Sequence, residues 1–334
     1  MNNIDSAAQI RGAQSPSPVS DNNKKLSIKS RKRSRALFYA AYMALPVLQF
    51  CVFYIYVNFN SFVLAFQKYS IPEDGSMGFL ISFAGFSNFA SAWKTFLTSG
   101  GMIINSLRLF ACNILIVIPL ALLFSFYLYK GYKFSGIFKT VLFMPKVISD
   151  LVLSVIFKYI ANDGYMGVVQ MLTGTMPQYG LMDNPATEVA TILFYNVWVG
   201  FGVNVLLYQG AMSAINESLV EAAKLDGANA VQEFFKLTIP MIFSTISTFI
   251  VLAIAAVFTN QMNLLALKGV SAGELSTIGY YLYIQAQESD VITSKLGVLD
   301  YPTLSAFGLI ISLIVGPITL IARALMNKYG PSVD

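Results

Sequence analysis

Residues 221–240 read EAAKLDGANAVQEFFKLTIP, a polar segment that separates two long apolar stretches. The segment opens on Glu-Ala-Ala, carries Asp-Gly near its middle and closes on Ile-Pro. Alanine, lysine and leucine favour helix, and a glycine suits the left-handed stop just past a last helical turn. The segment therefore predicts two short helices joined at Gly227, in a loop between two membrane spans.

The rest of the chain has the composition of a membrane protein. Of its 334 residues, 56% are hydrophobic and 12% are charged, whereas a soluble domain is roughly half apolar and about a quarter charged. A helix needs about 20 apolar residues to cross the hydrocarbon core. Five runs of that length contain no Asp, Glu, Lys or Arg: 36–67, 109–129, 189–216, 237–267 and 301–322. A sixth span is expected at 137–160, which is apolar except for Lys146 and Asp150.

These spans predict an all-α membrane protein with about six transmembrane helices, because backbone that faces lipid must satisfy its own hydrogen bonds. Basic residues crowd the amino end: Lys24, Lys25, Lys29, Arg31, Lys32, Arg33 and Arg35. By the positive-inside rule this end is cytoplasmic, and six crossings make the carboxyl end cytoplasmic too. Residues 1–35 are expected to be a disordered basic cytoplasmic tail. Residues 36–334 are expected to form the transmembrane domain.

Several kinds of chemistry are excluded by what the sequence lacks. It contains no histidine, so neither a histidine-based metal site nor a Ser-His-Asp triad can form. Cys51 and Cys112 fall in expected spans and are interpreted as small apolar side chains. Gly131 and Gly136 have the spacing of a phosphate-binding loop, but Ile and Phe follow instead of Lys and Ser or Thr. The basic run abuts a span without interleaved aromatic residues, so no nucleic-acid partner is expected.

Helix-end signals surround the loop at 212–240. Ser218 and Glu221 have the S-x-x-E spacing of a capping box, so a helix is expected to begin there. A second short helix is expected at about 228–235. Pro240 is expected to start the next membrane helix, where its missing N–H costs nothing.

Small side chains make this loop a candidate docking surface. Ala222, Ala223 and Gly227 would let a partner surface approach closely, and Glu221 offers a charge to a basic partner. The alternative interpretation is an ordinary amphipathic loop that packs on its own helices.

The order Glu-Ala-Ala, Asp-Gly-Ala, Phe and Leu-x-Ile-Pro resembles the cytoplasmic EAA loop of permease subunits in binding-protein-dependent ABC importers. In that family the loop docks on an ATPase subunit and carries its motion into the membrane. The family motif usually ends Ile-x-Leu-Pro, whereas residues 237–240 read Leu-Thr-Ile-Pro, a conservative exchange. The resemblance implies that the ATPase-coupling residues are Glu221, Ala222, Ala223, Asp226, Gly227 and Pro240.

Other segments between about 40 and 325 are similar to the sugar-permease branch of this family. They are Leu45-Pro46, LAFQKYS at 64–70, GFSNFASAW at 85–93 and FMP at 143–145. Gln170 stands in a segment where the family usually carries Asn, and no role is assigned to it.

The resemblance implies a type I ABC importer permease fold and a set of partners. The chain would be a transport subunit rather than an enzyme, and it would move a carbohydrate, with an oligosaccharide favoured, across a bacterial cytoplasmic membrane by alternating access. It would work within membrane lipid beside a second homologous permease subunit, two ATPase subunits and an extracytoplasmic solute-binding protein. No cofactor is expected in this chain, because the resemblance places ATP and Mg in the ATPase partners.

Polar side chains inside the expected spans are candidates for the solute pathway. Asn196 and Asn204 share one face of the fourth span, with Tyr195 and Trp198 nearby, and Asn260 lies near the outer end of the fifth. Amides pair with hydroxyl groups, and aromatic rings stack on the apolar faces of pyranoses. These five residues are therefore the candidate pathway residues. The alternative is that the amides join membrane helices to one another.

Lys146 and Asp150 are four residues apart in the expected third span. Charges inside a membrane usually face the protein interior or each other. An internal ion pair, a contact to the partner subunit and a contact to the solute are all open interpretations.

Three other functions are weighed against a carbohydrate permease. An ABC permease could carry another solute, such as a peptide or a polyol phosphate. An ion-coupled secondary transporter is permitted by the few intramembrane charges, but it leaves the loop unexplained. A membrane-embedded enzyme would need a convergent acid-base or metal cluster, for which the sequence offers little.

Overall fold

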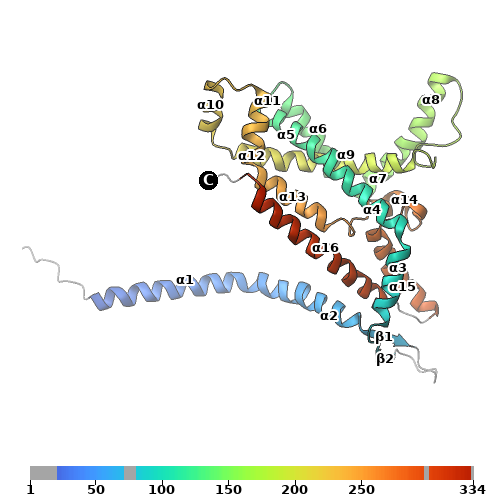
Figure 1. Cartoon of the computed structure of the whole chain (residues 1–334), viewed down its shortest axis with the longest axis horizontal. Coiled ribbons are helices and arrows are strands. Elements are labelled where there is room, and N and C mark those ends of the chain that lie inside the picture. Colours follow the sequence, from blue (N-terminus) through green and yellow to red (C-terminus); the bar gives the residue numbers. More distant parts are fainter. Residues whose placement is uncertain (1–20, 71–79, 297–300, 332–334) are drawn as a thin grey trace, which may run out of the picture. The chain divides into compact units, whose positions relative to one another are not determined.

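The computed structural model describes the backbone of residues 21–70, 80–296 and 301–331. The chain divides into two compact units, Met1–Ser61 and Phe62–Asp334. The described secondary structure is helical throughout, apart from one short hairpin (Figure 1). The all-α membrane architecture expected from the apolar runs is therefore present.

One long helical stretch makes up the described part of the first unit. α1 (Asp21–Phe50) continues through a π-helical turn (Cys51–Tyr56) into α2 (Val57–Leu64), where the second unit begins. Its apolar part, Arg35–Leu64, is long enough to cross a membrane and is the first expected span. The described apolar side chains of this span make no buried core within the first unit.

Residues 21–35 are helical, so the expected disorder is wrong for this part of the amino-terminal tail. Lysine and arginine are good helix formers, and the basic run can extend a helix that the adjoining apolar run supports. Residues 1–20, the remainder of the expected tail, lie outside the described residues.

Three unbroken helices of the second unit are also long and apolar enough to cross a membrane. They are Gly100–Tyr129, which joins α4 (Gly100–Cys112) to α5 (Ile118–Tyr129) through a π-helical turn (Asn113–Val117), then α9 (Glu188–Ser213) and α16 (Tyr301–Tyr329). α5 packs along α9. α16 packs on α13 (Phe243–Ala255) and α3 (Ser87–Thr98).

Two further spans consist of bent pairs of helices. Ser135–Val147 and Asp150–Thr173 meet at 103°, and Ala230–Met241 and Phe243–Ala255 meet at 68°. The structure thus has 4 helices of membrane-spanning length and composition among its described residues, or up to 6 if each bent pair is one span. The six spans agree with the sequence only when the third and fifth are counted as broken helices.

The break in the third span corrects the expectation of one continuous helix over 137–160. α6 (Ser135–Val147) ends at Ile148 and α7 (Asp150–Tyr159) begins after Ser149, and both linking residues are extended, with ψ 144° and 133°. Pro145 lies in the last turn of α6, and a proline cannot donate the backbone hydrogen bond that an α-helix needs there. α7 then continues through a π-helical turn (Ile160–Gly164) into α8 (Tyr165–Thr173).

A small antiparallel hairpin, which the sequence did not predict, follows the first span. β1 (Gln67–Ser70) pairs with β2 (Leu80–Phe83), and Gln67 lies opposite Phe83. The Asn88 side chain of α3 donates hydrogen bonds to the Ala65 and Gln67 carbonyls at 2.9 and 2.8 Å, which anchors the hairpin to α3.

The remaining elements lie on either side of the bent fifth span. Before it come α10 (Glu217–Leu225) and α11 (Ala230–Gln232). After it come α14 (Leu264–Lys268), a 3₁₀ turn (Gly273–Leu275) and α15 (Ile278–Leu296). Within the second unit, α10 and α11 lie at the opposite end from β1 and β2 (Figure 1).

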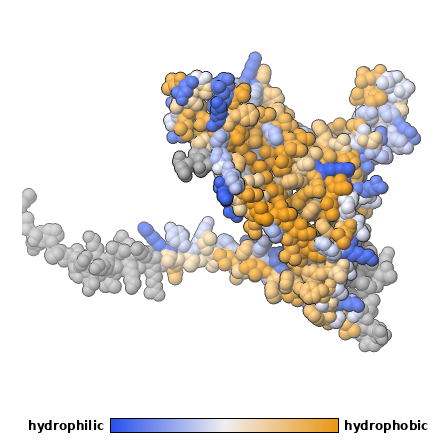
Figure 2. All heavy atoms as spheres, viewed as in Figure 1, coloured by the Kyte–Doolittle hydropathy of each residue, from blue (hydrophilic) through white to orange (hydrophobic). Residues whose placement is uncertain are grey.

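Buried apolar side chains of the second unit form three clusters. One surrounds Tyr195 and Leu264, one surrounds Tyr208 and Phe234, and one surrounds Phe307. Hydrophobic side chains cover the helices on the face seen in Figure 2, whereas hydrophilic ones gather around α10 and α11. An apolar exterior with a polar end is what a helix bundle in a bilayer requires.

Candidate functional site

The loop before the fifth span forms the short helix that the sequence predicts, but with a different cap. α10 begins after Asn216, whose side chain accepts a hydrogen bond from the Ser218 N–H at 3.1 Å. The expected capping box of Ser218 and Glu221 is therefore wrong. Asparagine is as good an N-cap acceptor as serine, and Asn216 has the extended backbone that a cap needs.

Gly227 ends α10 in the conformation that the sequence predicts. Its φ is +78°, in the left-handed region that glycine adopts without steric penalty. The Gly227 N–H donates to the Lys224 carbonyl and the Ala228 N–H donates to the Ala223 carbonyl, both at 3.0 Å. This pair of bonds is the Schellman motif, which satisfies the last carbonyls of a helix while the chain reverses.

A second cap follows at once. The Asn229 side chain accepts from the Gln232 N–H at 2.9 Å, and the Gln232 side chain accepts from the Asn229 N–H at 3.0 Å. This reciprocal capping box starts a helix that runs through α11, a π-helical turn (Glu233–Thr238) and α12 (Ile239–Met241). The second helix of the loop is therefore longer than the expected 228–235.

Pro240 lies inside this helix and does not start the next span, which corrects the sequence-based expectation. The chain changes direction two residues later, at Ile242, and α13 begins at Phe243. A proline ring would meet the carbonyl four residues earlier, here that of Lys236, in a regular α-helix. The wider π-helical turn lies at that point, and π turns are a known way to relieve such a clash.

The second helix of the loop is seated on the membrane bundle. Phe234 is 5% exposed and packs edge-on against Phe126 of α5, with ring centroids 5.1 Å apart. The buried Glu233 carboxylate pairs with Lys130 at the end of α5. The Lys130 ammonium also lies 5.5 Å from the centre of the Phe126 ring. This half of the loop packs on its own helices, as the alternative interpretation proposed.

The first helix of the loop presents an exposed surface. Glu221 and Ala222 are exposed, and Leu225 is 89% exposed. Beside them a hollow of about 410 Å³ lies between the two helices. It is lined by Ala223, Asp226, Gly227, Ala228, Gln232, Glu233, Lys236 and Leu237. An apolar anchor beside a hollow rimmed by small residues can receive a complementary partner surface.

Amide side chains from three spans meet at a cavity of about 450 Å³ among the membrane helices. They are Asn113, Asn196, Asn204, Asn260 and Asn263. The remaining lining residues are apolar, apart from Ser106, and none of the lining residues is charged. The structure therefore brings three of the five pathway candidates, Asn196, Asn204 and Asn260, to one cavity.

The other two candidates, Tyr195 and Trp198, do not line this cavity. Tyr195 is 1% exposed, and its hydroxyl pairs with that of Ser154 of α7 at 2.8 Å. Both rings pack near Phe157, with centroids 4.8 and 6.2 Å away. Successive helix residues point about 100° apart, so Tyr195 faces α7 while Asn196 faces the cavity.

The cavity amides differ in how many of their hydrogen bonds are already made. Asn196 donates to the Ile192 and Met262 carbonyls, each at 2.9 Å, and accepts from Asn263 at 2.9 Å. It joins two parts of the fold, as the helix-joining interpretation proposed. Asn204 donates to the Gly200 carbonyl at 2.9 Å. Its carbonyl oxygen has no partner among the described residues, so it retains capacity for a solute hydroxyl.

Sequence reasoning missed Asn113 and Asn263 as lining residues. Asn113 is the single amide of the charge-free run 109–129, whereas Asn263 shares the run 237–267 with Asn260 and Gln261. Asn196 and Asn204 are recognisable by their shared helix face. Asn105 stands the same eight residues before Asn113 in the span Gly100–Tyr129, and this spacing could have indicated Asn113. Asn263 lies only three residues beyond Asn260, and that proximity could have indicated a shared role.

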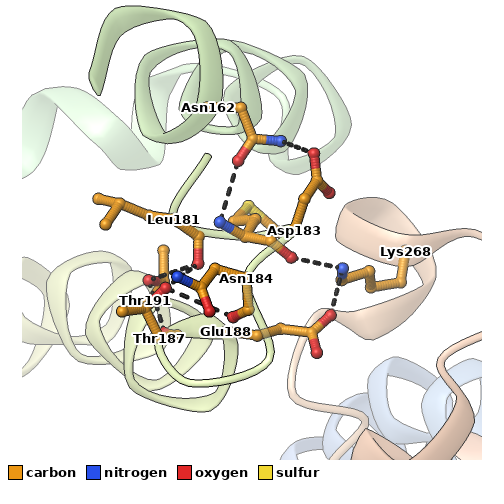
Figure 3. Close-up of polar contacts among 9 residues, drawn as sticks. Asn162, Leu181, Asp183, Asn184, Thr187, Glu188, Thr191 and Lys268 are labelled. Carbon is orange, nitrogen blue, oxygen red and sulfur yellow. Dashed lines mark hydrogen bonds and ion pairs between the residues drawn. The ribbon is translucent and has the colours of Figure 1, made fainter. Parts of the chain in front are cut away.

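A polar network joins α14 to the loop before α9 and to the start of α9. Lys268 of α14 pairs with Glu188 in the first turn of α9 and donates to the Met182 carbonyl at 2.8 Å. Asn162 donates to Asp183 at 2.8 Å and accepts from the Met182 N–H at 2.9 Å. Figure 3 shows side chains from three helices that point toward the loop containing Leu181 and Asp183. The network therefore ties α14 to the start of α9.

Lys146 and Asp150 form an ion pair at 3.5 Å, but not on one helix. Lys146 lies in the last turn of α6 and Asp150 begins α7, so the pair spans the break between them. Their side chains are 44% and 58% exposed, and pairs this exposed contribute about 0–1 kcal/mol. The internal pair exists, and it leaves both charges accessible.

A membrane bundle with an uncharged amide cavity and an exposed, capped loop is an arrangement that suits a transport subunit. The family described as binding-protein-dependent transport system inner membrane component matches residues 117–334, and this chain belongs to it. The matched region contains the whole loop and four of the five cavity amides, while Asn113 lies just before it. The chain is therefore a membrane transport permease and not an enzyme.

Similar proteins carry related descriptions. The chain is 30% identical over 218 residues to the arabinooligosaccharides transport system permease protein AraP of Bacillus subtilis, over 64% of this chain and 65% of that protein, slightly less than two thirds of its length. It is 24% identical to the multiple sugar-binding transport system permease protein MsmF of Streptococcus mutans, over 86% of this chain and 94% of that protein.

A solved structure establishes the fold. It is a bacterial ABC transporter involved in the import of the acidic polysaccharide alginate, with TM-score 0.68 and 18% identity over 90% of this chain and 98% of that one. The likeness confirms the type I ABC importer permease fold that the loop motif implied.

Proposed function

We propose that this chain is the permease subunit of an ATP-driven importer that moves a carbohydrate, with an oligosaccharide favoured. One observation carries the proposal. The exposed α10 leads, through the continuous helix Ala230–Met241, into α13, and α13 lines the amide cavity. A movement of the loop can therefore be transmitted to the cavity through these connected helices. The printed names of the relatives, with their arabinooligosaccharide and multiple-sugar systems, support carbohydrate as the cargo.

The partners follow from the family and from the exposed surface of the loop. A second homologous permease completes the pathway, and two ATPase subunits each hold one loop. An extracytoplasmic solute-binding protein delivers the cargo, in keeping with the binding-protein dependence of the family. ATP and Mg bind to the ATPase partners, and this chain holds no cofactor. The protein lies in a bacterial cytoplasmic membrane with both ends inside.

Coupling begins at the hollow beside Gly227. An ATPase surface that fills this hollow contacts α10 through Glu221 and Leu225, both exposed. Phe234 and the pair between Lys130 and Glu233 hold the second helix of the loop against α5. Approach of the two ATPases then moves α10 and α13 as a connected body and opens the bundle to the outside, and hydrolysis resets it.

The cavity offers hydrogen bonds without charge. An amide presents a donor and an acceptor, so it can pair with a sugar hydroxyl in either direction. Asn204 and Asn113 have bonding capacity within the described residues, whereas Asn196 is committed to the protein. Weak, exchangeable contacts of this kind let a solute pass and leave.

A first experiment tests the assembly. The tagged chain is purified from its native membrane in mild detergent, and its partners are identified by mass spectrometry. Recovery of an ATPase, a second permease and a solute-binding protein supports the proposal. Recovery of the chain alone under several gentle detergents, with ion-dependent transport in proteoliposomes, would favour the secondary transporter instead.

A pair of variants tests the coupling role of Gly227. No atom lies within 4 Å of a Cβ built on Gly227, so a side chain there disturbs no neighbour in this chain. Gly227→Leu is expected to abolish uptake while the bundle stays folded, because leucine is strained at φ +78° and its side chain fills the docking hollow. Gly227→Asn is the matched control, since asparagine tolerates the left-handed region. Wild-type uptake in Gly227→Leu would contradict the coupling role.

A second pair separates solute contact from helix joining. Asn204→Leu is expected to weaken apparent affinity for the cargo by about tenfold, the equivalent of one lost hydrogen bond, with an unchanged melting temperature. Asn196→Leu is expected to lower the melting temperature, because it removes the two bonds that join α9 to Met262 and Asn263. Unchanged affinity and rate in Asn204→Leu would assign that amide to helix joining as well.

A further inference from the structure

The backbone at Met262 and Asn263 has an uncommon conformation for residues with side chains. Their φ angles are +58° and +53°, both left-handed. Asparagine visits this region more easily than most residues, but methionine does so at a steric cost. Met262 is also 2% exposed, so the cost is met inside the protein and not in a mobile loop. Such strain persists only where the surroundings hold it in place.

Asn196 supplies that hold. Its amide donates to the Met262 carbonyl at 2.9 Å and its carbonyl oxygen accepts from the Asn263 amide at 2.9 Å. A third bond, from the Met262 N–H to the Asn260 side chain at 2.8 Å, closes the turn on itself. Two of the bonds that fix the turn therefore come from one side chain on another helix. The Leu264 N–H also donates to the Gln261 carbonyl at 3.0 Å, and the Thr277 hydroxyl donates to the Asn260 carbonyl at 2.9 Å.

The turn separates two hollows. On one side is the amide cavity of about 450 Å³, and on the other a hollow of about 350 Å³. Asn260 and Asn263 line both. The second hollow is completed by Leu151, Gln261, Leu265 and Ala266. The four-residue turn is thus the wall between them.

The chain around this wall is not helical, although it lies in the apolar run 237–267. α13 ends at Ala255, and residues 256–263 are turns and irregular backbone. Within a membrane, irregular backbone is tolerated only where it is buried in protein or lines a water-filled space. The second hollow also borders Leu151, in the first turn of α7 just after the break in the third span. Two interrupted spans therefore meet at this wall.

We infer that the turn at 260–263 is a strained partition between the solute cavity and a second hollow on its outer side, and that Asn196 is the positioning residue that holds it closed. The inference rests on the proposed transport function. The partition opens when the hydrogen bonds from Asn196 are lost, because the backbone of Met262 can then leave its left-handed conformation. A solute hydroxyl that competes for the Asn196 amide would release it.

Sidedness of thiol labelling tests the partition. Two alanines make a matched pair of reporters, since Ala253 lines only the amide cavity and Ala266 lines only the second hollow. Each is changed to Cys in a chain with Cys51→Ala and Cys112→Ala, within the whole importer in right-side-out vesicles. A membrane-impermeant maleimide is added outside, without solute or ATP.

Labelling of Ala266→Cys is expected to be at least about tenfold faster than that of Ala253→Cys, as for a closed state that dominates its open state. Adding Asn196→Ala is expected to raise labelling of Ala253→Cys towards that of Ala266→Cys and to leave Ala266→Cys unchanged. Because labelling needs no cargo, it succeeds or fails independently of the transport assay.

Two variants at Asn263 test the strain itself. Both Asn263→Ala and Asn263→Gly remove the bond to Asn196, but only glycine keeps φ +53° without cost. Labelling of Ala253→Cys is expected to rise more in Asn263→Ala than in Asn263→Gly. These variants also decide the question if Asn196→Ala fails to fold.

Three results would overturn the inference. They are equal labelling of the two reporters in the parent chain, labelling of Ala266→Cys only in inside-out vesicles, or identical labelling of Ala253→Cys in folded Asn263→Ala and Asn263→Gly.

Discussion

The loop at 212–240 and the cavity wall at 260–263 both contain turns fixed by asparagine side chains, but these bonds reach over very different lengths of chain. In the loop, Asn216 and Asn229 accept hydrogen bonds from groups two and three residues away. In the wall, Asn196 bonds to Met262 and Asn263, 66 and 67 residues away. The caps of the loop are therefore fixed by nearby sequence, whereas the wall is fixed by assembly of the bundle, as is the seating of the second helix of the loop on α5.

This difference suits the two tasks that we propose for these segments. A part that carries motion from a partner must keep its shape while the bundle rearranges, and local caps do not depend on the bundle. A wall that opens must respond to the bundle, and bonds between distant helices change when those helices move. Local hydrogen bonds keep the loop rigid, whereas hydrogen bonds between distant helices let the wall change when the helices move.

The largest effect on stability is expected where the loop meets the bundle. Lys130 and Glu233 have side-chain exposures of 14% and 5%. Lys130→Met leaves the buried Glu233 carboxylate without its cation, which is expected to destabilise the protein by about 3 kcal/mol. Thermal unfolding of the purified protein in detergent measures the change.

The double variant Lys130→Met with Glu233→Met is the control for this pair. It is expected to recover most of the lost stability, because no charge is left buried. Equal melting temperatures of the single and double variants would show that the ion pair does not hold the loop on the bundle. The loop would then depend on local contacts alone.

A smaller effect is expected at the crossing of α6 and α9. A Cβ on Gly202 would clash with the Leu142 carbonyl oxygen, so one backbone must shift. Gly202→Ala is expected to cost about 2 kcal/mol of stability, as overpacking in a core does. Unfolding monitored by size-exclusion chromatography after heating provides the measurement.

Gly210→Ala is the matched change on the same helix. No atom lies within 4 Å of its Cβ, so alanine is expected to stabilise by about 0.5 kcal/mol through backbone entropy alone. Similar melting of the two variants would show that the crossing has room to relax and that bundle contacts are less restrictive than the geometry indicates.

The smallest effect is expected at the cap of α10. Asn216→Ala removes the bond to the Ser218 N–H and should destabilise α10 by about 1 kcal/mol. Because α10 is locally fixed, hydrogen exchange of the amides at 217–221 should speed up while the melting temperature of the bundle stays the same.

Ser218→Ala distinguishes the cap seen in the structure from the one the sequence indicated. Its hydroxyl caps nothing in the structure, so the change is expected to fall within about 0.5 kcal/mol of wild type. Faster exchange in Ser218→Ala than in Asn216→Ala would restore the S-x-x-E capping box and reverse the assignment.

Features fixed by local contacts could be predicted from the sequence, whereas features fixed by contacts between distant segments could not. The stop at Gly227 was predictable because glycine is the residue that a left-handed turn selects. The membrane spans were predictable because hydropathy is summed over about 20 residues. The N-cap is Asn216 and not Ser218. Both side chains are good acceptors two residues apart, and the choice between them depends on which residue has the extended backbone of a cap.

Sequence reasoning failed where distant segments meet. Asn105 donates to the carbonyls of Glu274 and Ser276, 169 and 171 residues away, and no local pattern marks it as a joining residue. Tyr195 and Asn196 are neighbours in sequence, yet one faces α7 and the other faces the cavity. Helical spacing shows which residues share a face, but it does not show what that face meets.

The sequence by itself determined the membrane class, the helical spans and the capped loop with its motif, because hydropathy, propensity and capping act over a few turns of chain. Only the tertiary structure decided which amides share a cavity and where the third and fifth spans break. It also placed the strained turn at Met262 against Asn196. Those features depend on bonds and packing between residues far apart in sequence, which form only when the helices assemble.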